Sequence, residues 1–403
     1  MSTEGIPLTG VEPNDFQRKH PLKDPGNHGP DHFKGKMSKL RFSTRQALKR
    51  FTDTQSDYLS KWQLKHKTKW RSIYFAGTAV LGSHTFYVLC LPTPAWAGSF
   101  EGIADLVYIL AYSIYLSGYL KDYWCLPRPR SPPLHRITLS EYTTMEYGAP
   151  SSHTANATGA SLYLLWTIAE LNISVSQKLA LSFLVVIYYL TLVVGRIYCG
   201  MHGLLDIISG ALVGIVCILG RVGMNHLLAD FQCGDYWWFP ILSTFWGLLI
   251  LFKHIKPVDE CPCFADSVAF VGVVGGIEWS KWILQRLGIE YGHGMRVTGA
   301  PHLLVGRLLV GGLIVVIWKY VIGKPLVYSF LIHVLRLKDD RPEKIEERRK
   351  YANAKECPPY IGEAKIDIVG RYAIYAGIPP VVLLACPPIF KVLNLLNLPD
   401  KLS

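Results

Sequence analysis

The chain of 403 residues is half hydrophobic, and only 18% of its residues are charged, whereas soluble domains carry about 25% charged residues. Residues 72–91, 179–195 and 236–252 contain no Asp, Glu, Lys or Arg. Because roughly 20 apolar residues cross the core of a bilayer, these runs exclude a large soluble helical protein and predict a polytopic membrane protein. The net charge of +12 suits anionic lipid headgroups. No nucleic-acid-binding module is recognisable, so nucleic acid is not an expected partner.

The first 71 residues are polar and lack the apolar core of a signal peptide. Residues 1–35 are rich in Gly, Pro and His and are expected to be disordered. Between residues 37 and 62, apolar side chains recur at helical spacing among Lys and Arg, namely Leu40, Leu48, Phe51, Leu59 and Trp62. The pattern favours an amphipathic helix on the membrane surface, with a solvated basic tail as the alternative.

Hydrophobic patterning predicts eight transmembrane helices and a doubtful ninth. Besides the three uncharged runs, the expected spans are residues 102–120, 154–171, 203–220, 264–280 and 303–322. The ninth, residues 373–391, is expected to be broken or re-entrant because it contains Pro379, Pro380, Pro387 and Pro388. The predicted fold class is all-α, a polytopic bundle of transmembrane helices.

These elements divide the chain into four parts: a basic N-terminal segment (1–71), a transmembrane domain (72–330) with its functional core at 102–221, a charged loop (331–370) and a Pro-broken C-terminal segment with its tail (371–403). The nine cysteines lack the spacing of a disulfide framework and are expected to be buried thiols. The CPC triplet at 261–263 is too tight for an ordinary zinc site, so no metal site is predicted.

Three polar clusters interrupt the apolar chain. The first, KDYWCLPRPRSPP, begins with Lys121 at the end of the second expected span and contains Arg128. Two fixed cations near a membrane surface can bind a phosphate, Arg through its planar fork of donors and Lys as a point charge. Alone, they fit better with cations that flank a span and extend toward the surface.

The second cluster is YGAPSSHT, residues 147–154. Pro150 stops any preceding helix, and Ser151 or Ser152 can cap the helix that follows. The first backbone N–H groups of that helix would then favour an anion, with His153 beside them. A plain capping turn with an incidental histidine is the alternative.

The third cluster is GRIYCGMHGLLDIISG, residues 195–210. His202 and Asp206 are four residues apart and therefore share one face of a helix. Asp206 can accept a hydrogen bond from the N–H of one imidazole nitrogen and leave the other nitrogen free to attack. Arg196 lies six residues upstream of His202. An interior polar pair or a pair of metal ligands is the alternative, although no other His or carboxylate has matching spacing.

Successive spans cross the membrane in opposite directions, and this alternation, or helix parity, brings the three clusters to the same side. The first ends the second span, the second begins the third span, and the third joins the fourth span to the fifth. All three therefore lie at one membrane face. Two arginines, a lysine, a helix N-terminus and two histidines favour a phosphate ester, because phosphoryl transfer mainly needs positioning and charge stabilisation.

The clusters resemble the motifs of the type 2 phosphatidic acid phosphatase superfamily, the lipid phosphate phosphatases. Its pattern, K-x6-RP, PSGH and SR-x5-H-x3-D, corresponds here to Lys121-x6-Arg128-Pro129, Pro150-Ser151-Ser152-His153 and Gly195-Arg196-x5-His202-x3-Asp206. Ser152 replaces the family Gly and Gly195 the family Ser, and no role is assigned to Gly195. RPRSPP, YGAPSSHT and RIYCGMHGLLDIISG are similar to the sphingoid long-chain-base-1-phosphate phosphatase branch.

The resemblance implies a metal-independent phosphatase of the endoplasmic reticulum membrane that hydrolyses sphingosine, dihydrosphingosine or phytosphingosine 1-phosphate without a cofactor. His202 would form a phosphohistidine, Asp206 would orient it, and His153 would act as acid and then base. The phosphate would be bound by Lys121, Arg128, Ser151, Ser152 and Arg196. A phosphatase of phosphatidate or a polyprenyl diphosphate, or a non-catalytic lipid-binding or scrambling relative, is the alternative. Substrate and membrane lipids are the expected partners, and a homo-oligomer is compatible with the sequence.

Two arguments disagree about the membrane face of the site. Parity puts the site on the side of the N-terminus, where residues 1–71, 121–136 and 323–371 are rich in Lys and Arg. The positive-inside rule then favours the cytosol. The resemblance implies a luminal site, and Lys121 and Arg128 would be needed for phosphate in either orientation. We therefore expect a luminal site and a luminal N-terminus.

Overall fold

The computed structural model describes residues 24–98, 101–140, 142–228, 233–289, 301–351, 353–354 and 356–396. Apart from isolated bridge residues, such as Asp259 paired with Pro359, the regular elements of these residues are all helical, which confirms the all-α prediction. The N-terminal third contains α2 (Pro30–Lys34), α3 (Lys39–Asp53), α4 (Gln55–His66), α5 (Lys69–Thr78), α6 (His84–Cys90) and α7 (Pro92–Trp96).

The long helices follow. The middle of the chain forms α8 (Glu101–Trp124), α9 (Ser152–Glu170), α10 (Val175–Tyr198), α11 (Leu204–Leu227), α12 (Trp238–Phe252) and α13 (Phe264–Arg286). The last third forms α14 (Pro301–Ile317), α15 (Gly323–Ser329), α16 (Arg341–Arg349), α17 (Lys365–Ala376), α18 (Ile378–Pro380) and α19 (Cys386–Val392).

By length and composition, six helical segments of the described chain can cross a membrane, or seven if a bent pair counts as one span. The protein is therefore a multi-pass membrane protein, with fewer spans than the eight to nine expected. The expected span 72–91 belongs to the bent pair, 69–82 with 86–96, which turns by 62°. The run 236–252 yields only the 15 residues of α12. The first half of α9 is small and polar, which suits a helix packed inside protein.

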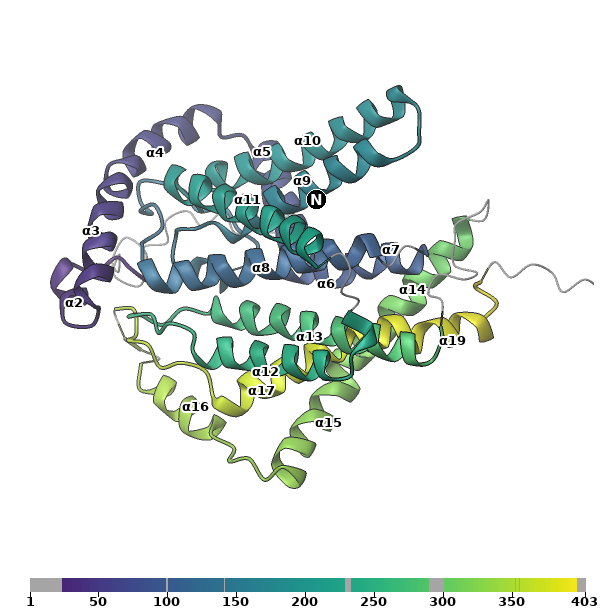
Figure 1. Ribbon diagram of the computed structural model, residues 1–403. Coiled ribbons are helices and arrows are strands. Elements are labelled where there is room, and N and C mark those ends of the chain that lie inside the picture. Colours follow the sequence, from purple (N-terminus) through teal and green to yellow (C-terminus); the bar gives the residue numbers. More distant parts are fainter. Residues whose placement is uncertain are drawn as a thin grey trace, which may run out of the picture.

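Helix α8 lies at the centre of the bundle (Figure 1). It packs against α9 and α11 on one side and against α13 on the other. Helix α10 packs on α9, and α12 and α17 pack on α13. The C-terminal end of α8 and the N-terminal ends of α9 and α11 meet at the end of the bundle where α2 and α3 lie.

The C-terminal segment is not broken, contrary to the expectation from its four prolines. Residues 365–392 form one apolar helical run long enough to cross a membrane. Pro379 and Pro380 cannot donate the backbone hydrogen bonds of an α-helix, and a π-helical turn at Val381–Ala385 follows them directly. The change in helix type lets the chain continue through the prolines instead of ending there.

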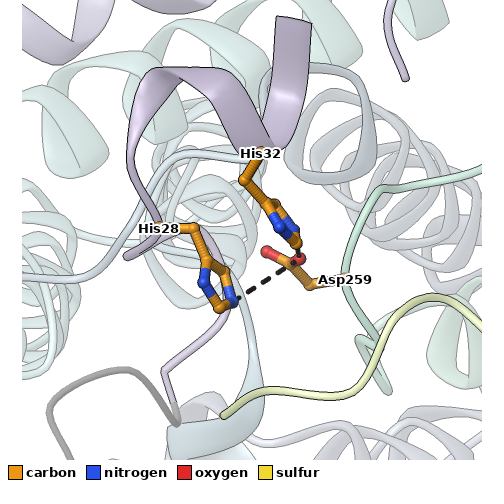
Figure 2. A group of neighbouring side chains, drawn as sticks. All are labelled: His28, His32 and Asp259. Carbon is orange, nitrogen blue, oxygen red and sulfur yellow. Dashed lines mark hydrogen bonds and ion pairs between the residues drawn. The ribbon is translucent and has the colours of Figure 1, made fainter. Parts of the chain in front are cut away.

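The N-terminal segment is ordered from residue 24, so the prediction of disorder over 1–35 is wrong for its last part, while residues 1–23 lie outside the described residues. One buried carboxylate, Asp259, anchors it (Figure 2). Its Oδ2 accepts a hydrogen bond from Gly26 N (2.8 Å), and its Oδ1 lies 2.7 Å from His32 Nε2. His28 stacks on His32 with 4.0 Å between ring centroids.

The helix expected between residues 37 and 62 is confirmed, as the pair α3 and α4. Its buried side is basic and polar. Arg41 Nε donates to Tyr123 O (2.7 Å), and a terminal nitrogen of Arg45 donates to Gly26 O (2.9 Å). Leu40 and Phe51 remain exposed, so contact of that side with lipid stays a prediction.

Helices α9 and α11 approach so closely that parts of their backbones touch. A Cβ atom at Gly210 would lie 2.5 Å from Ser151 O, and one at Gly214 would lie 2.5 Å from Ala155 O. Small residues four apart allow such close packing between membrane helices. The contact ties the start of α9 to the first turns of α11, because Ser151 N donates to Asp206 O (2.9 Å).

Replacing Gly214 by alanine should force these backbones apart. Overpacking of this kind costs about 1–3 kcal/mol, so G214A should lower the apparent Tm of the purified protein in detergent. The matched control is G220A in the same helix, where a Cβ meets nothing within 4 Å. It should leave the Tm unchanged or raise it slightly, because alanine favours helix. Equal Tm values for the two variants would contradict this account of the α9–α11 contact.

Candidate active site

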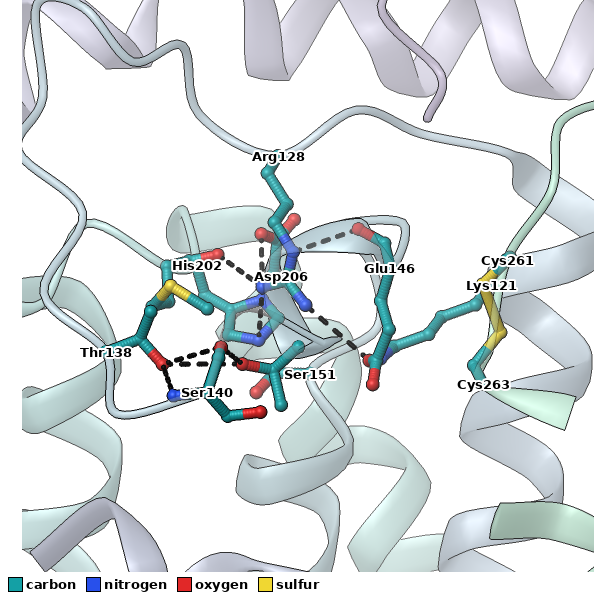
Figure 3. A network of polar contacts seen from close by, with 12 residues as sticks. Lys121, Arg128, Thr138, Ser140, Glu146, Ser151, His202, Asp206, Cys261 and Cys263 are labelled. Atoms are coloured by element: carbon teal, nitrogen blue, oxygen red, sulfur yellow. Dashed lines mark hydrogen bonds and ion pairs between the residues drawn. A yellow bond between two sulfur atoms is a disulfide. The ribbon is translucent and has the colours of Figure 1, made fainter. Parts of the chain in front are cut away.

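The three polar clusters meet at the end of the bundle, as helix parity predicts (Figure 3). A cavity of about 620 Å³ opens beside them. Its polar wall includes Lys121, Glu146, Ser152, His153 and Asn156. Arg128, Ser151, Arg196, His202 and Asp206 are buried in the surrounding protein. The structure therefore brings all eight predicted site residues to one place.

Arg128 is the centre of the polar network. Its Nε donates to Glu146 O (2.9 Å), and Nη1 donates to Met201 O (2.7 Å). Nη1 also lies 3.1 Å from His202 Nε2. One guanidinium thus connects the first cluster, the loop before the second cluster and the third cluster. The planar fork of arginine suits this role, because its five donors point in fixed directions.

The contacts of His202 determine which ring nitrogen carries the proton. Guanidinium can only donate, so Nε2 accepts from Arg128 and is the unprotonated nitrogen. Nδ1 then carries the proton and faces Asp206 Oδ2 at 3.2 Å. Gly203 N also donates to that oxygen (2.9 Å), which fixes the carboxylate at the start of α11. The predicted His202–Asp206 pair is present, but His202 lies in the turn before α11 instead of on a shared helix face. Its second nitrogen is hydrogen-bonded instead of free.

Burial lowers the pKa of His202 well below its usual range, and three neighbouring cations lower it further, namely Arg128, Lys121 and Arg196. The imidazole is therefore neutral at neutral pH. Burial also lowers the pKa of Arg128 to about 10, against the opposing effect of Glu146. Arg128 stays charged at neutral pH, so the pair offers a nucleophilic nitrogen beside a permanent cation.

The second cluster forms the capping turn that the sequence predicts. Ser151 Oγ accepts hydrogen bonds from Thr154 N (3.3 Å) and Thr154 Oγ1 (3.1 Å), and this caps α9. Ser152 and His153 follow in the first turn and line the cavity. Gly82 lies close to the His153 ring, since a Cβ there would be 2.7 Å from Cδ2. The capping role therefore belongs to Ser151, while Ser152 and His153 face the cavity.

Glu146 is a residue of the candidate site that sequence reasoning missed. Its carboxylate forms an ion pair with Lys121, and its Oε2 lies 3.5 Å from Arg128 Nη2. Its side chain also lines the cavity. The available signal was its position: it directly precedes the YGAPSSHT cluster, and a carboxylate beside a predicted set of cations is a natural ion-pair partner.

Arg196 is buried, and its Nε has no hydrogen-bond partner in the described part of the chain. Its backbone oxygen accepts from Met201 N (3.1 Å) and His202 N (3.3 Å), which shapes the turn before α11. The neighbouring Gly195, where the family pattern has Ser, packs against Phe75, since a Cβ there would lie 3.0 Å from the phenyl ring. A small residue at 195 thus accommodates α5.

The N-terminal helices hold the loops that carry the clusters. Gln63 Nε2 donates to His135 O (2.7 Å) and Tyr198 O (2.8 Å), and its Oε1 accepts from His135 N (2.8 Å). Gln55 Oε1 accepts from Leu204 N (3.0 Å), at the start of α11. The segment therefore supports the candidate site, whereas its basic amphipathic sequence suggested only a helix on the membrane surface or a solvated tail.

Two groups of side chains among the described residues have the spacing of metal ligands. One is His28, His32 and Asp259 (Figure 2), and the other is Asp122 with Cys261 and Cys263. The two cysteines form a disulfide (Figure 3), which corrects the expectation that the cysteines are buried thiols and leaves no thiolate for a metal. Neither group contains a predicted site residue.

Comparison with known proteins identifies the family. The PAP2 superfamily model matches residues 102–227, which span α8 to α11 and all eight predicted site residues. No solved structure gives a significant match to the chain.

Relatives extend the match along the chain. The sequence is 54% identical over 378 residues to dihydrosphingosine 1-phosphate phosphatase YSR3 of Saccharomyces cerevisiae, covering 94% of this chain and 93% of the relative. It is 31% identical over 379 residues to dihydrosphingosine 1-phosphate phosphatase C823.11 of Schizosaccharomyces pombe, covering 88% and 92%. It is 29% identical over 212 residues to sphingosine-1-phosphate phosphatase 2 of Mus musculus, covering 52% and 58%. The chain therefore belongs to the PAP2 superfamily and, within it, to the branch of the sphingoid base 1-phosphate phosphatases.

Proposed function

We propose that this protein removes the phosphate of sphingoid base 1-phosphates, without a metal ion and through a phosphohistidine. Two relatives that match nearly the whole chain are named for dihydrosphingosine 1-phosphate, which supports this substrate class. The observation that carries the proposal is the distance of 3.1 Å between Arg128 Nη1 and His202 Nε2. A phosphate oxygen bound to Arg128 brings phosphorus next to the unprotonated nitrogen of the imidazole.

His202 attacks phosphorus as the neutral imidazole, the form that its lowered pKa maintains. The bond from Nε2 to phosphorus forms while the bond from phosphorus to the lipid oxygen breaks. Asp206 holds the Nδ1 proton and offsets the positive charge that develops on the ring. Lys121, Arg128 and Arg196 stabilise the negative charge on the non-bridging oxygens.

His153 acts as the acid for the leaving group and then as the base for the attacking water. In protonated form it gives its proton to the lipid alkoxide, which leaves as the free sphingoid base. It next takes a proton from the water that attacks the phosphohistidine, and this step releases orthophosphate and restores His202. Burial lowers the pKa of His153 well below its usual range, and the neighbouring cations Arg196, Lys121 and Arg128 lower it further. The acid role therefore requires the negative charge of the bound phosphate, which favours the protonated imidazole. Ser151, Ser152 and the N-terminus of α9 help to bind the phosphate.

The cavity supports a lipid as substrate. Its lining includes polar groups such as Lys121 and His153 and also apolar side chains, among them Val80, Ile114 and Leu139. A lining of both kinds suits a molecule with a charged head and a hydrocarbon chain. The phosphate enters between the cations, and the chain lies along the apolar side chains.

We further propose that the site faces the lumen of the endoplasmic reticulum. Basic residues at this end of the bundle weigh against this under the positive-inside rule. Several of them, however, serve interior contacts that either orientation needs. Arg41 donates to Tyr123 O, and Arg136 forms an ion pair of 2.6 Å with Asp24. The segment from residue 24 packs at this same end, so the site and that segment share a side of the membrane.

Purified protein should hydrolyse dihydrosphingosine 1-phosphate in the presence of EDTA. Histidine and fixed cations replace the metal of other phosphatases, so chelation removes nothing that the reaction needs. Phosphate release is measured alone and in competition with phosphatidate. A preference for phosphatidate would refute the substrate assignment, and a loss in EDTA that Mg²⁺ restores would refute the metal-independent mechanism.

His202→Ala should lower kcat by roughly a thousandfold or more, because it removes the attacking atom. Asp206→Asn should lower kcat less, since it disturbs the orientation of the ring and leaves the nucleophile in place. Both rates are compared at equal amounts of monodisperse protein. Activity above a few per cent in the His202 variant would rule out the phosphohistidine.

An N-glycosylation acceptor inserted at residues 138–140 should be glycosylated, because this loop joins the first two clusters and Leu139 is exposed. The controls carry acceptors in the segments 92–101 or 222–235, which helix parity puts on the opposite side of the membrane. Modification of the controls together with an unmodified acceptor at 138–140 would place the site in the cytosol.

A further inference from the structure

The geometry points to Glu146 as a subsite for the ammonium group of the substrate, and this inference rests on the proposed function. Glu146 would then be the residue that selects sphingoid base phosphates, which carry a free amine, over lipid phosphates that lack one. The Glu146 carboxylate is buried at the boundary between the phosphate-binding cations and the cavity.

Three contacts fix the position of Glu146 (Figure 3). The carboxylate pairs with Lys121, and its Oε2 lies 3.5 Å from Arg128 Nη2. The backbone oxygen of Glu146 accepts a hydrogen bond from Arg128 Nε (2.9 Å). The side chain therefore touches both cations of the first cluster, while its remaining surface faces the cavity that His153 also lines.

The chemistry of the substrate matches this position. In a sphingoid base 1-phosphate, the phosphate is on the first carbon and the ammonium is on the second. Phosphorus and nitrogen are separated by four single bonds, which corresponds to about 4–5 Å. A phosphate on Lys121 and Arg128 thus places the ammonium within ion-pair distance of a carboxylate that touches the same two cations.

Charge balance explains how the contact becomes selective. When a phosphate takes donors of Lys121 and Arg128, the Glu146 carboxylate shares its partners with a dianion. A buried carboxylate without sufficient compensation is costly. The ammonium supplies the missing positive charge, whereas phosphatidate or an N-acylated lipid phosphate supplies none and leaves two anions in contact. Selectivity arises from this penalty on the wrong substrate as well as from attraction to the right one.

Among the described residues that line the cavity, Asp266 is the other carboxylate, and Arg371 lines the same cavity. Asp266 lies in the first turn of α13, a helix that carries none of the predicted phosphate-binding residues. Asp266→Asn is therefore the matched control, because it removes an equal charge from the same cavity.

The test compares dihydrosphingosine 1-phosphate with its N-acetyl derivative, which has the same chain and phosphate but no positive charge. The ratio of the two kcat/KM values is measured for the wild-type full-length protein, Glu146→Gln and Asp266→Asn. The ratio should favour the free amine in the wild type, fall at least tenfold in E146Q and stay within about twofold in D266N. A purely structural role for Glu146 would lower both kcat/KM values equally and leave the ratio unchanged.

The other outcomes of these measurements also decide whether the assignment to Glu146 holds. A fall in the ratio in D266N but not in E146Q would overturn the assignment and move the subsite to Asp266. If E146Q is inactive on both substrates, Glu146→Asp replaces it, because the shorter carboxylate retracts from the ammonium while keeping its charge. An unchanged ratio in E146D would then overturn the inference. Wild-type protein that hydrolyses neither substrate would refute the proposed function itself.

Discussion

The contact between α9 and α11 determines the geometry of the candidate site. Gly210 and Gly214 let the backbones approach until Ser151 N can donate to Asp206 O. That hydrogen bond joins the capping turn of α9, which presents Ser152 and His153, to the helix that holds Asp206 behind His202. With any larger residue at these glycines, the acid–base histidine and the nucleophilic histidine of the proposed mechanism would move apart.

The same end of the bundle buries several charged side chains, and specific partners compensate Lys121 and Arg128, while Arg196 Nε has no hydrogen-bond partner in the described part of the chain. Lys121 pairs with Glu146, and Arg128 donates to backbone oxygens and to His202. Removing either partner of such a contact leaves a buried charge uncompensated, which is costly. In the proposed complex, the phosphate of a sphingoid base 1-phosphate brings two negative charges into this cation-rich environment, and the ammonium of the same molecule returns one positive charge to Glu146. The proposed site is thus complementary to a zwitterionic head group.

Much of this arrangement could be predicted from sequence, since apolar run lengths indicate spans and span parity places polar clusters on one face. The limits of prediction were physical. Prolines predict a break in residues 373–391, but a π-helical turn follows Pro379 and Pro380 and the helical run continues. Glu146 lies outside the three clusters, and only the fold brings it to Lys121. Gln55 and Gln63 support the site through hydrogen bonds to backbone atoms that are distant in the sequence, and the helical periodicity of their segment does not reveal such contacts.

Attachment of phosphate to His202 is the central claim, and isotopic trapping tests it most directly. Protein mixed with dihydrosphingosine 1-phosphate labelled with ³²P is quenched within milliseconds in alkali and digested. The account predicts label on the peptide that contains His202, stable in alkali and lost in acid, and absent from His202→Ala. Label on another residue, or turnover with no labelled protein at any quench time while product accumulates in a burst, would contradict it.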